Sequence, residues 1–252
     1  RPPRSTLSSS SAASDVYKRQ ALLINSKRKF REDATRALLR PYNFFADIRD
    51  QRILSGFHSN ILILLLAGSN ALLLTIILYF FKNNILFEKI IISFGNYKLS
   101  SFIGFLAWNP QEAFIYLYIG SILLFILLSF FIHLSSFFVK TKVLFSSVYS
   151  MVIWAFLPLA LLLPIEAILY KIMLTKTYNI IIFIFILLFF IWNFRRLLKG
   201  VYVIFDVRSL FVYLYSFLTI IILSSAFIFY NQLTVSAVDY IILSIKQYIQ
   251  IF

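Results

Sequence analysis

Two ionisable side chains, Glu166 and His133, lie inside long apolar stretches of this sequence. If such stretches cross a membrane, an ionisable group within them is costly to bury and marks a candidate site for a proton, an ion or a substrate. The carboxyl of Glu166 would bind a proton or a cation if its span continues through Tyr170. The alternative is that the span ends near Pro164 and Glu166 lies at the interface, where a carboxylate costs little.

His133 lies about six residues from the end of its apolar stretch. An imidazole titrates near neutral pH, so a proton-dependent role is one interpretation. The other interpretation is structural, because a histidine in this position donates a hydrogen bond to a neighbouring hydroxyl or backbone carbonyl. Ser129, Ser135 and Ser136 are close enough in sequence to serve.

Pro158 and Pro164 are six residues apart in the same apolar stretch as Glu166. Proline removes a helix hydrogen bond and clashes with the preceding turn, so each proline kinks or breaks a helix. One hypothesis is a broken helix that lines a cavity. The other is a simple bend that neighbouring helices accommodate.

A basic cluster near the N-terminus contains Lys27, Arg28, Lys29 and Arg31. Anionic lipid head groups attract such residues by about 1 kcal/mol per charge near the membrane surface. The cluster would also set the topology of the chain without binding anything specific. Membrane proteins commonly carry cytoplasmic Lys and Arg, so we expect no nucleic-acid partner.

The composition places these residues in a membrane protein. Of 252 residues, 61% are hydrophobic and only 13% are charged, whereas soluble domains have about 45–50% apolar and about 25% charged residues. Cysteine is absent and there are two histidines, so we expect no cofactor and no metal site. The sequence contains no GxSxG, P-loop or HExxH motif, and we predict that the protein is not an enzyme.

Apolar runs of about 20 residues are long enough to cross a bilayer. We predict an all-α fold, a polytopic membrane bundle with five transmembrane helices in a membrane domain over 59–232. The expected spans are 59–81, 113–139, 143–170, 178–194 and 210–230.

Three segments outside these spans are more polar or interrupted. Residues 21–58 form a basic, amphipathic segment, in which Pro41 ends one helix and a second helix places Phe44, Phe45 and Ile48 on one face. Residues 82–112 contain one or two interfacial pieces. Residues 233–252 form an amphipathic external tail.

Residues 1–20 resemble the conceptual translation of a sequencing-library adapter. Residues 10–20, SSAASDVYKRQ, read back as a widely used transposase adapter, and the preceding RPPRST matches its flow-cell primer. We therefore expect residues 1–20 to be a disordered artefact and the native N-terminus to be missing.

Lys and Arg residues are unequally divided between alternate loops. One side has eight in residues 21–58, two in 140–142 and four in a loop at 195–208. The other side has three in 82–112, two in 171–176 and one in the C-terminal tail. The positive-inside rule places the N-terminus inside and the C-terminus outside. A bacterial cytoplasmic membrane is expected, with the endoplasmic reticulum or Golgi membrane as the alternative.

Three short segments resemble the Yip domain family of five-span membrane proteins, over about residues 40–230. They are PYNFFADIRDQR at 41–52, VYSMVIWAFLPLALLLP at 148–164 and WNFRRLLKGV at 192–201, the last with a Lys-Gly turn. The resemblance implies a non-enzymatic integral membrane protein, and eukaryotic relatives bind Rab-type GTPases in vesicle trafficking.

Two functions follow as hypotheses. The first is a membrane scaffold or adaptor that recruits partners through residues 21–58. It would assemble as a homo-oligomer or with other membrane proteins. The alternative is a membrane-embedded subunit of a transporter or permease, with Glu166 or His133 lining a route.

Overall fold

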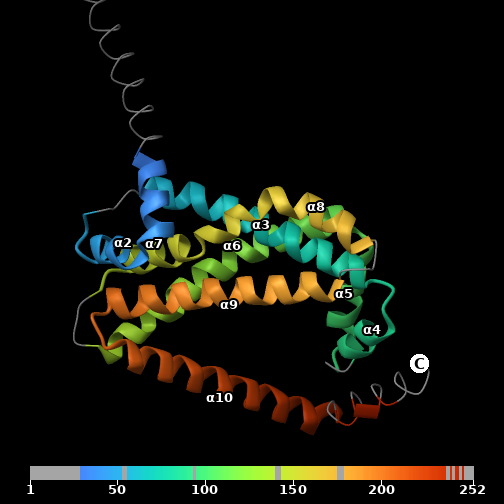
Figure 1. Cartoon of the computed structure of the whole chain (residues 1–252). Coiled ribbons are helices and arrows are strands. Elements are labelled where there is room, and N and C mark those ends of the chain that lie inside the picture. Colours follow the sequence, from blue (N-terminus) through green and yellow to red (C-terminus); the bar gives the residue numbers. More distant parts are fainter. Residues whose placement is uncertain are drawn as a thin grey trace, which may run out of the picture.

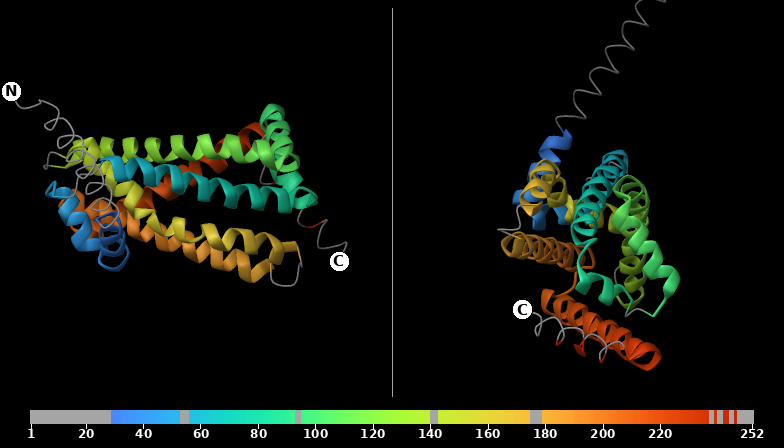
Figure 2. Two further views of the ribbon diagram at one scale, coloured as in Figure 1. Left: turned by 90° about the horizontal axis from the view of Figure 1, so that it is seen from above. Right: turned by 90° about the vertical axis from the view of Figure 1, so that its right-hand side faces the viewer.

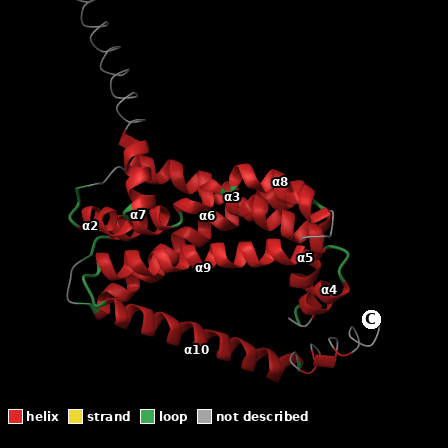
Figure 3. Ribbon diagram, in the orientation of Figure 1, coloured by secondary structure: helices red, strands yellow, loops and turns green. Residues whose placement is uncertain are grey.

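The computed structural model describes residues 29–52, 56–92, 95–139, 143–174 and 179–236, together with residues 239, 242, 243 and 246. Helices account for nearly all of these residues, and none of them lies in a strand (Figure 3). A first helix covers residues 29–39. The elements that follow are α2 (Pro41–Arg49), α3 (Gly56–Phe81), α4 (Ile85–Ile92), α5 (Tyr97–Trp108), α6 (Pro110–Leu134), the 3₁₀ helix η1 (Ser135–Phe138), α7 (Phe145–Ala155), the 3₁₀ helix η2 (Leu157–Leu161), α8 (Leu163–Leu174), α9 (Asn179–Ile204) and α10 (Ser209–Val235).

Five helical segments are long and apolar enough to cross a membrane, which confirms the predicted fold class for the described part of the chain. They are Gly56–Phe81, Pro110–Phe137, Phe145–Glu166, Ile180–Ile204 and Ser209–Leu233. Helices suit such sequences because each backbone N–H and C=O group is paired within its own segment, where lipid offers no partner.

The spans alternate in direction along one long axis (Figure 1). Residues 29–49, the start of α7 and the turn at 205–208 lie at the end that we call the N-terminal end. The short helices α4 and α5 lie at the opposite end (Figure 2), within the segment predicted to hold one or two interfacial pieces.

The fourth span is longer than the sequence indicated. Residues 195–204 continue α9 for ten residues beyond the expected end at 194. The Lys199-Gly200 pair, expected to form a turn, lies inside this helix. The helix continues because its charged residues divide between two faces, with Arg196 buried and Arg195 exposed.

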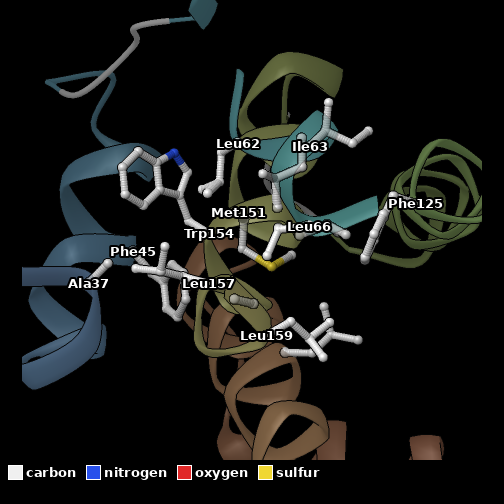
Figure 4. Packing of buried hydrophobic residues seen from close by; sticks show 14 of the residues in the cluster. Ala37, Phe45, Leu62, Ile63, Leu66, Phe125, Met151, Trp154, Leu157 and Leu159 are labelled. Carbon is white, nitrogen blue, oxygen red and sulfur yellow. The ribbon is translucent and has the colours of Figure 1, made fainter. Parts of the chain in front are cut away.

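The hydrophobic core is concentrated toward the N-terminal end. Side chains from α2, α3, α6, α7 and η2 meet there, including Phe45, Leu66, Phe125, Met151 and Trp154 (Figure 4). In the most apolar stretch of the third span 61% of the residues are buried, whereas none is buried in the corresponding stretch of α10. The third span is therefore the centre of the bundle, and α10 lies outside it.

Gly200 allows α9 to approach α7 closely. A Cβ at this position would lie 2.5 Å from Met151 Sδ and 2.6 Å from Met151 Cγ. Met151 is fully buried, so its side chain has little room to move. A glycine at 200 is required by packing and not by a turn.

We expect Gly200→Ala to destabilise the protein by about 1–3 kcal/mol, because the added methyl overpacks the α7–α9 contact. The measurement is the thermal unfolding midpoint in detergent. Gly120→Ala in α6 is the matched control, since no atom lies within 4 Å of its Cβ position and alanine favours a helix. Equal destabilisation by both variants would contradict this account.

Candidate functional site

The third span is broken between α7 and α8. Pro158 has no N–H, and the N–H of Leu159 donates to Phe156 O at 2.9 Å. These are the two positions from which a helix would supply a donor to the carbonyl of Ala155. The break therefore leaves the last carbonyl of α7 in need of a partner from another element.

Arg196 of α9 supplies that partner. Its Nε donates to Ala155 O at 3.1 Å, and its Nη1 and Nη2 donate to Leu38 O at 3.3 Å and Ala37 O at 3.0 Å. The side chain is only 4% exposed. Helix C-termini carry partial negative charge, so one guanidinium stabilises the ends of two helices, α7 and residues 29–39, and joins both to α9.

Glu166 lies on the other side of the break, in the first turn of α8. It is 2% exposed, and its Oε1 lies 2.7 Å from Ser69 Oγ of α3. Ser69 Oγ also lies 2.8 Å from the carbonyl oxygen of Leu159 in η2. Oε2 of Glu166 is buried and has no hydrogen-bond partner in the described part of the chain. The helix continues past Glu166 to Leu174, although the stretch long and apolar enough to cross a membrane ends at Glu166.

The two prolines occupy different places in the break. Pro158 lies in η2, and Pro164 lies at the start of α8, where its missing N–H costs nothing. Between them lies the 3₁₀ helix η2. Ala155 O, at the end of α7, accepts from Arg196, and Leu159 O in η2 accepts from Ser69 in addition to the N–H of Leu162 at 3.0 Å. Neighbouring helices thus accommodate the break.

His133 is not part of this arrangement. Its ring contacts Phe145 edge-on at the start of α7, with ring centroids 5.6 Å apart. Its Nδ1 is buried and has no hydrogen-bond partner among the described residues, and the hydroxyls of Ser129 and Ser135 donate to backbone carbonyls instead. The structure therefore places His133 at the N-terminal end, against α7, and Glu166 beyond the break, against α3.

Residues 29–52 form a platform docked on the N-terminal end of the bundle, which we call the N-terminal platform. Phe44, Phe45 and Ile48 of α2 are buried, and they are the face that the sequence predicted. This face packs on α9 and α7, because the bundle offers it apolar partners. Arg49 also pairs with Asp206 at 3.0 Å, beyond the end of α9.

The outer surface of the platform is basic. Of the predicted lipid- or partner-binding residues, Lys29 and Arg31 are exposed there. Lys27 and Arg28 lie outside the described residues. The exposed basic residues of residues 29–52 are Lys29, Arg31, Arg36, Arg40, Arg49 and Arg52.

Asp33 is the buried acid of the platform. It is 4% exposed, and its Oδ2 has no hydrogen-bond partner in the described part of the chain. Burial raises the pKa of Asp33, and the positive charges of Lys29 and Arg36 oppose that rise. The carboxylate form is therefore unfavourable in the docked platform.

Three residues of these sites are not predicted from the sequence. The sequence assigns Arg196 to a loop at 195–208, although Asn193, Arg196 and Gly200 recur at helical spacing and are all buried. Ser69 is one of many small polar residues in the spans, and Asp33 is one of several acids in a basic segment, so neither stands out in the sequence. Only the helical periodicity around Arg196 offered a signal.

Comparison with protein-family models, with curated proteins and with solved structures finds no match to this chain. The resemblance to the Yip domain family therefore stays a prediction that rests on its three short segments.

We expect Arg196→Met to destabilise the protein, because a buried carbonyl that loses its partner costs about 1–3 kcal/mol. The thermal unfolding midpoint should fall, and residues 29–49 should become more sensitive to limited proteolysis. Arg195→Met is the matched control, since Arg195 is the exposed neighbour on the same helix. An Arg196 variant as stable as this control would show that the three hydrogen bonds are dispensable.

The raised pKa of Asp33 predicts a pH dependence of stability. A carboxyl whose pKa is higher in the folded state stabilises the fold below its ordinary pKa, and this contribution is lost as pH rises through the folded value. Wild-type stability should therefore decline as pH rises above about 4. Asp33→Asn should lessen this decline, whereas Glu112→Gln, an exposed control in α6, should retain it. The test is a series of thermal unfolding midpoints across this pH range, and an unchanged slope in Asp33→Asn would contradict the assignment.

Proposed function

We propose that this chain is a non-enzymatic integral membrane protein that acts as a membrane scaffold or adaptor. The observation that carries the proposal is the docked N-terminal platform. A tethered basic tail would suffice to set topology, but residues 29–52 are built into the bundle through Arg196 and the buried face of α2. They present a fixed basic surface.

A fixed surface favours recognition over simple electrostatic attraction. The ion pairs Arg36–Asp47 and Arg49–Asp206 hold the two platform helices and the end of α9 together. Charged groups held in place on a surface increase the specificity and the rate of association with a complementary partner. An acidic protein surface or anionic lipid head groups would complement this platform.

The positive-inside rule supports an orientation in which the platform faces the cytoplasm. Arg195 lies within the last ten residues of α9 and Arg208 lies in the turn that follows, and both are exposed. In this proposal the membrane is a bacterial cytoplasmic membrane, and the platform is where partners bind.

A second candidate function is a membrane-embedded subunit of a transporter or permease. The specific observation in its favour is the broken third span with Glu166 buried beside it. Broken helices and buried carboxyls in membrane spans are typical of ion and substrate pathways. This candidate requires Glu166 for transport, whereas the adaptor tolerates Glu166→Gln.

The first test is mild cross-linking in the native membrane, followed by purification and mass spectrometry. The adaptor predicts partners cross-linked to the platform, and it predicts that Lys29→Gln, Arg31→Gln and Arg40→Gln together abolish their recovery. The matched control removes three exposed positive charges elsewhere, with Lys98→Gln, Lys171→Gln and Lys246→Gln.

A stoichiometric ATPase or second permease subunit cross-linked to the spans would contradict the adaptor and favour the permease. Equal loss of partners in both triple variants would show that net charge, and not the platform, governs association.

A further inference from the structure

Three oxygen atoms from three elements meet at the break in the third span. Ser69 Oγ of α3 lies 2.8 Å from Leu159 O of η2 and 2.7 Å from Glu166 Oε1 of α8. Both distances are normal for hydrogen bonds between oxygen atoms. Ser69 is fully buried and Glu166 is 2% exposed, so the two side chains depend on these contacts, whereas Leu159 O also accepts from the N–H of Leu162 at 3.0 Å.

The number of hydrogen atoms available for these two contacts decides which protonation state of Glu166 fits the geometry. A serine hydroxyl has one hydrogen to donate, and a backbone carbonyl only accepts. If the carboxyl is ionised, Ser69 can satisfy either Leu159 O or Glu166, and the other contact brings two acceptors together. If the carboxyl is protonated, Glu166 donates to Ser69 and Ser69 donates to Leu159 O, and both contacts are hydrogen bonds.

Among the side chains that the structure describes around Glu166, none carries a charge that would stabilise a carboxylate. On α3 the titratable residues nearest to Ser69 are His58 and Tyr79, roughly 15 Å away along the helix by its rise per residue. η2 has none, and residues 180–191 of α9 are all apolar. On α8 itself, Lys171 is exposed and lies five residues further on, on a different face.

One feature keeps the ionised form accessible. Glu166 lies in the first turn of α8, where the helix dipole favours negative charge. The carboxyl is therefore able to release its proton as well as to hold it. With one carboxylate and two neutral oxygens, the group suits a proton better than Mg²⁺ or Ca²⁺, which take six or more oxygen ligands.

We propose that Glu166, Ser69 and the carbonyl of Leu159 form an intramembrane proton-binding site that closes the break between α7 and α8. The bound proton completes a hydrogen-bonded chain from α8 through α3 to η2. Its loss replaces one hydrogen bond with a contact between two acceptors and loosens α8 from α3. The site goes beyond the adaptor function and stands whether the chain is an adaptor or a permease subunit.

The test uses the full chain in liposomes and dicyclohexylcarbodiimide, an apolar reagent that modifies protonated carboxyls. Peptide mass spectrometry then locates the label. We expect label on Glu166 at neutral pH, its loss as pH rises, and none at this position in Glu166→Gln. Glu112, an exposed carboxyl in the first turn of α6, is the matched control and should stay unlabelled at neutral pH.

Two results would overturn the proposal. The first is a Glu166 that stays unlabelled at every pH while the protein remains folded. The second is labelling that sodium ions suppress and choline does not, which would assign the site to a metal cation. Neither result depends on partner binding, so failure here is distinct from failure of the adaptor function.

A stability measurement provides the second readout. The amide of Glu166→Gln can donate to Ser69 as the protonated carboxyl does, so this variant should keep the neutral-pH unfolding midpoint and lose the decline at alkaline pH. Glu166→Leu cannot donate and should have a lower midpoint at every pH. A wild-type midpoint that follows the same alkaline profile as Glu166→Gln would also overturn the proposal.

Discussion

The structure depends on one constraint, which is that a broken span must still pair its backbone within apolar surroundings. Pro158 deprives the carbonyl of Ala155 of its helical donors, and Arg196 restores one from α9. The same guanidinium accepts no hydrogen bonds and has further N–H groups to place. It places them on Ala37 and Leu38, and in doing so it fixes the N-terminal platform to the bundle.

The two sides of the break are stabilised by different kinds of side chain. On the α7 side a permanent cation pairs the free carbonyl, and arginine keeps its charge under all ordinary conditions. On the α8 side Ser69 contacts both the carboxyl of Glu166 and the carbonyl of Leu159, which also accepts from the N–H of Leu162. The first solution is fixed, whereas the second depends on a proton. This asymmetry makes the α8 side the place where the bundle is able to respond to its surroundings.

Burial follows from the same constraint. The third span needs polar partners on α3 and α9, and it is therefore the most enclosed of the five. Hydrogen bonds from Tyr149 to Asn60 and from Asn70 to Ser121 tie α3 to its neighbours α7 and α6. α10 is uninterrupted and has no such need, and none of the residues in its most apolar stretch is buried. Lipid is the natural environment of that surface.

The sequence by itself determined the all-α membrane class and the number of spans, because continuous apolar runs have one stable solution in lipid. It also identified Glu166, Pro158 and Pro164 as unusual, since charges and prolines stand out against apolar neighbours. Only the tertiary structure decided that Arg196 is buried, that α9 continues to Ile204 and that Ser69 meets Glu166. Those outcomes depend on partners from other helices, such as the carbonyl of Ala155 for Arg196, and a single segment does not specify which helices pack against it.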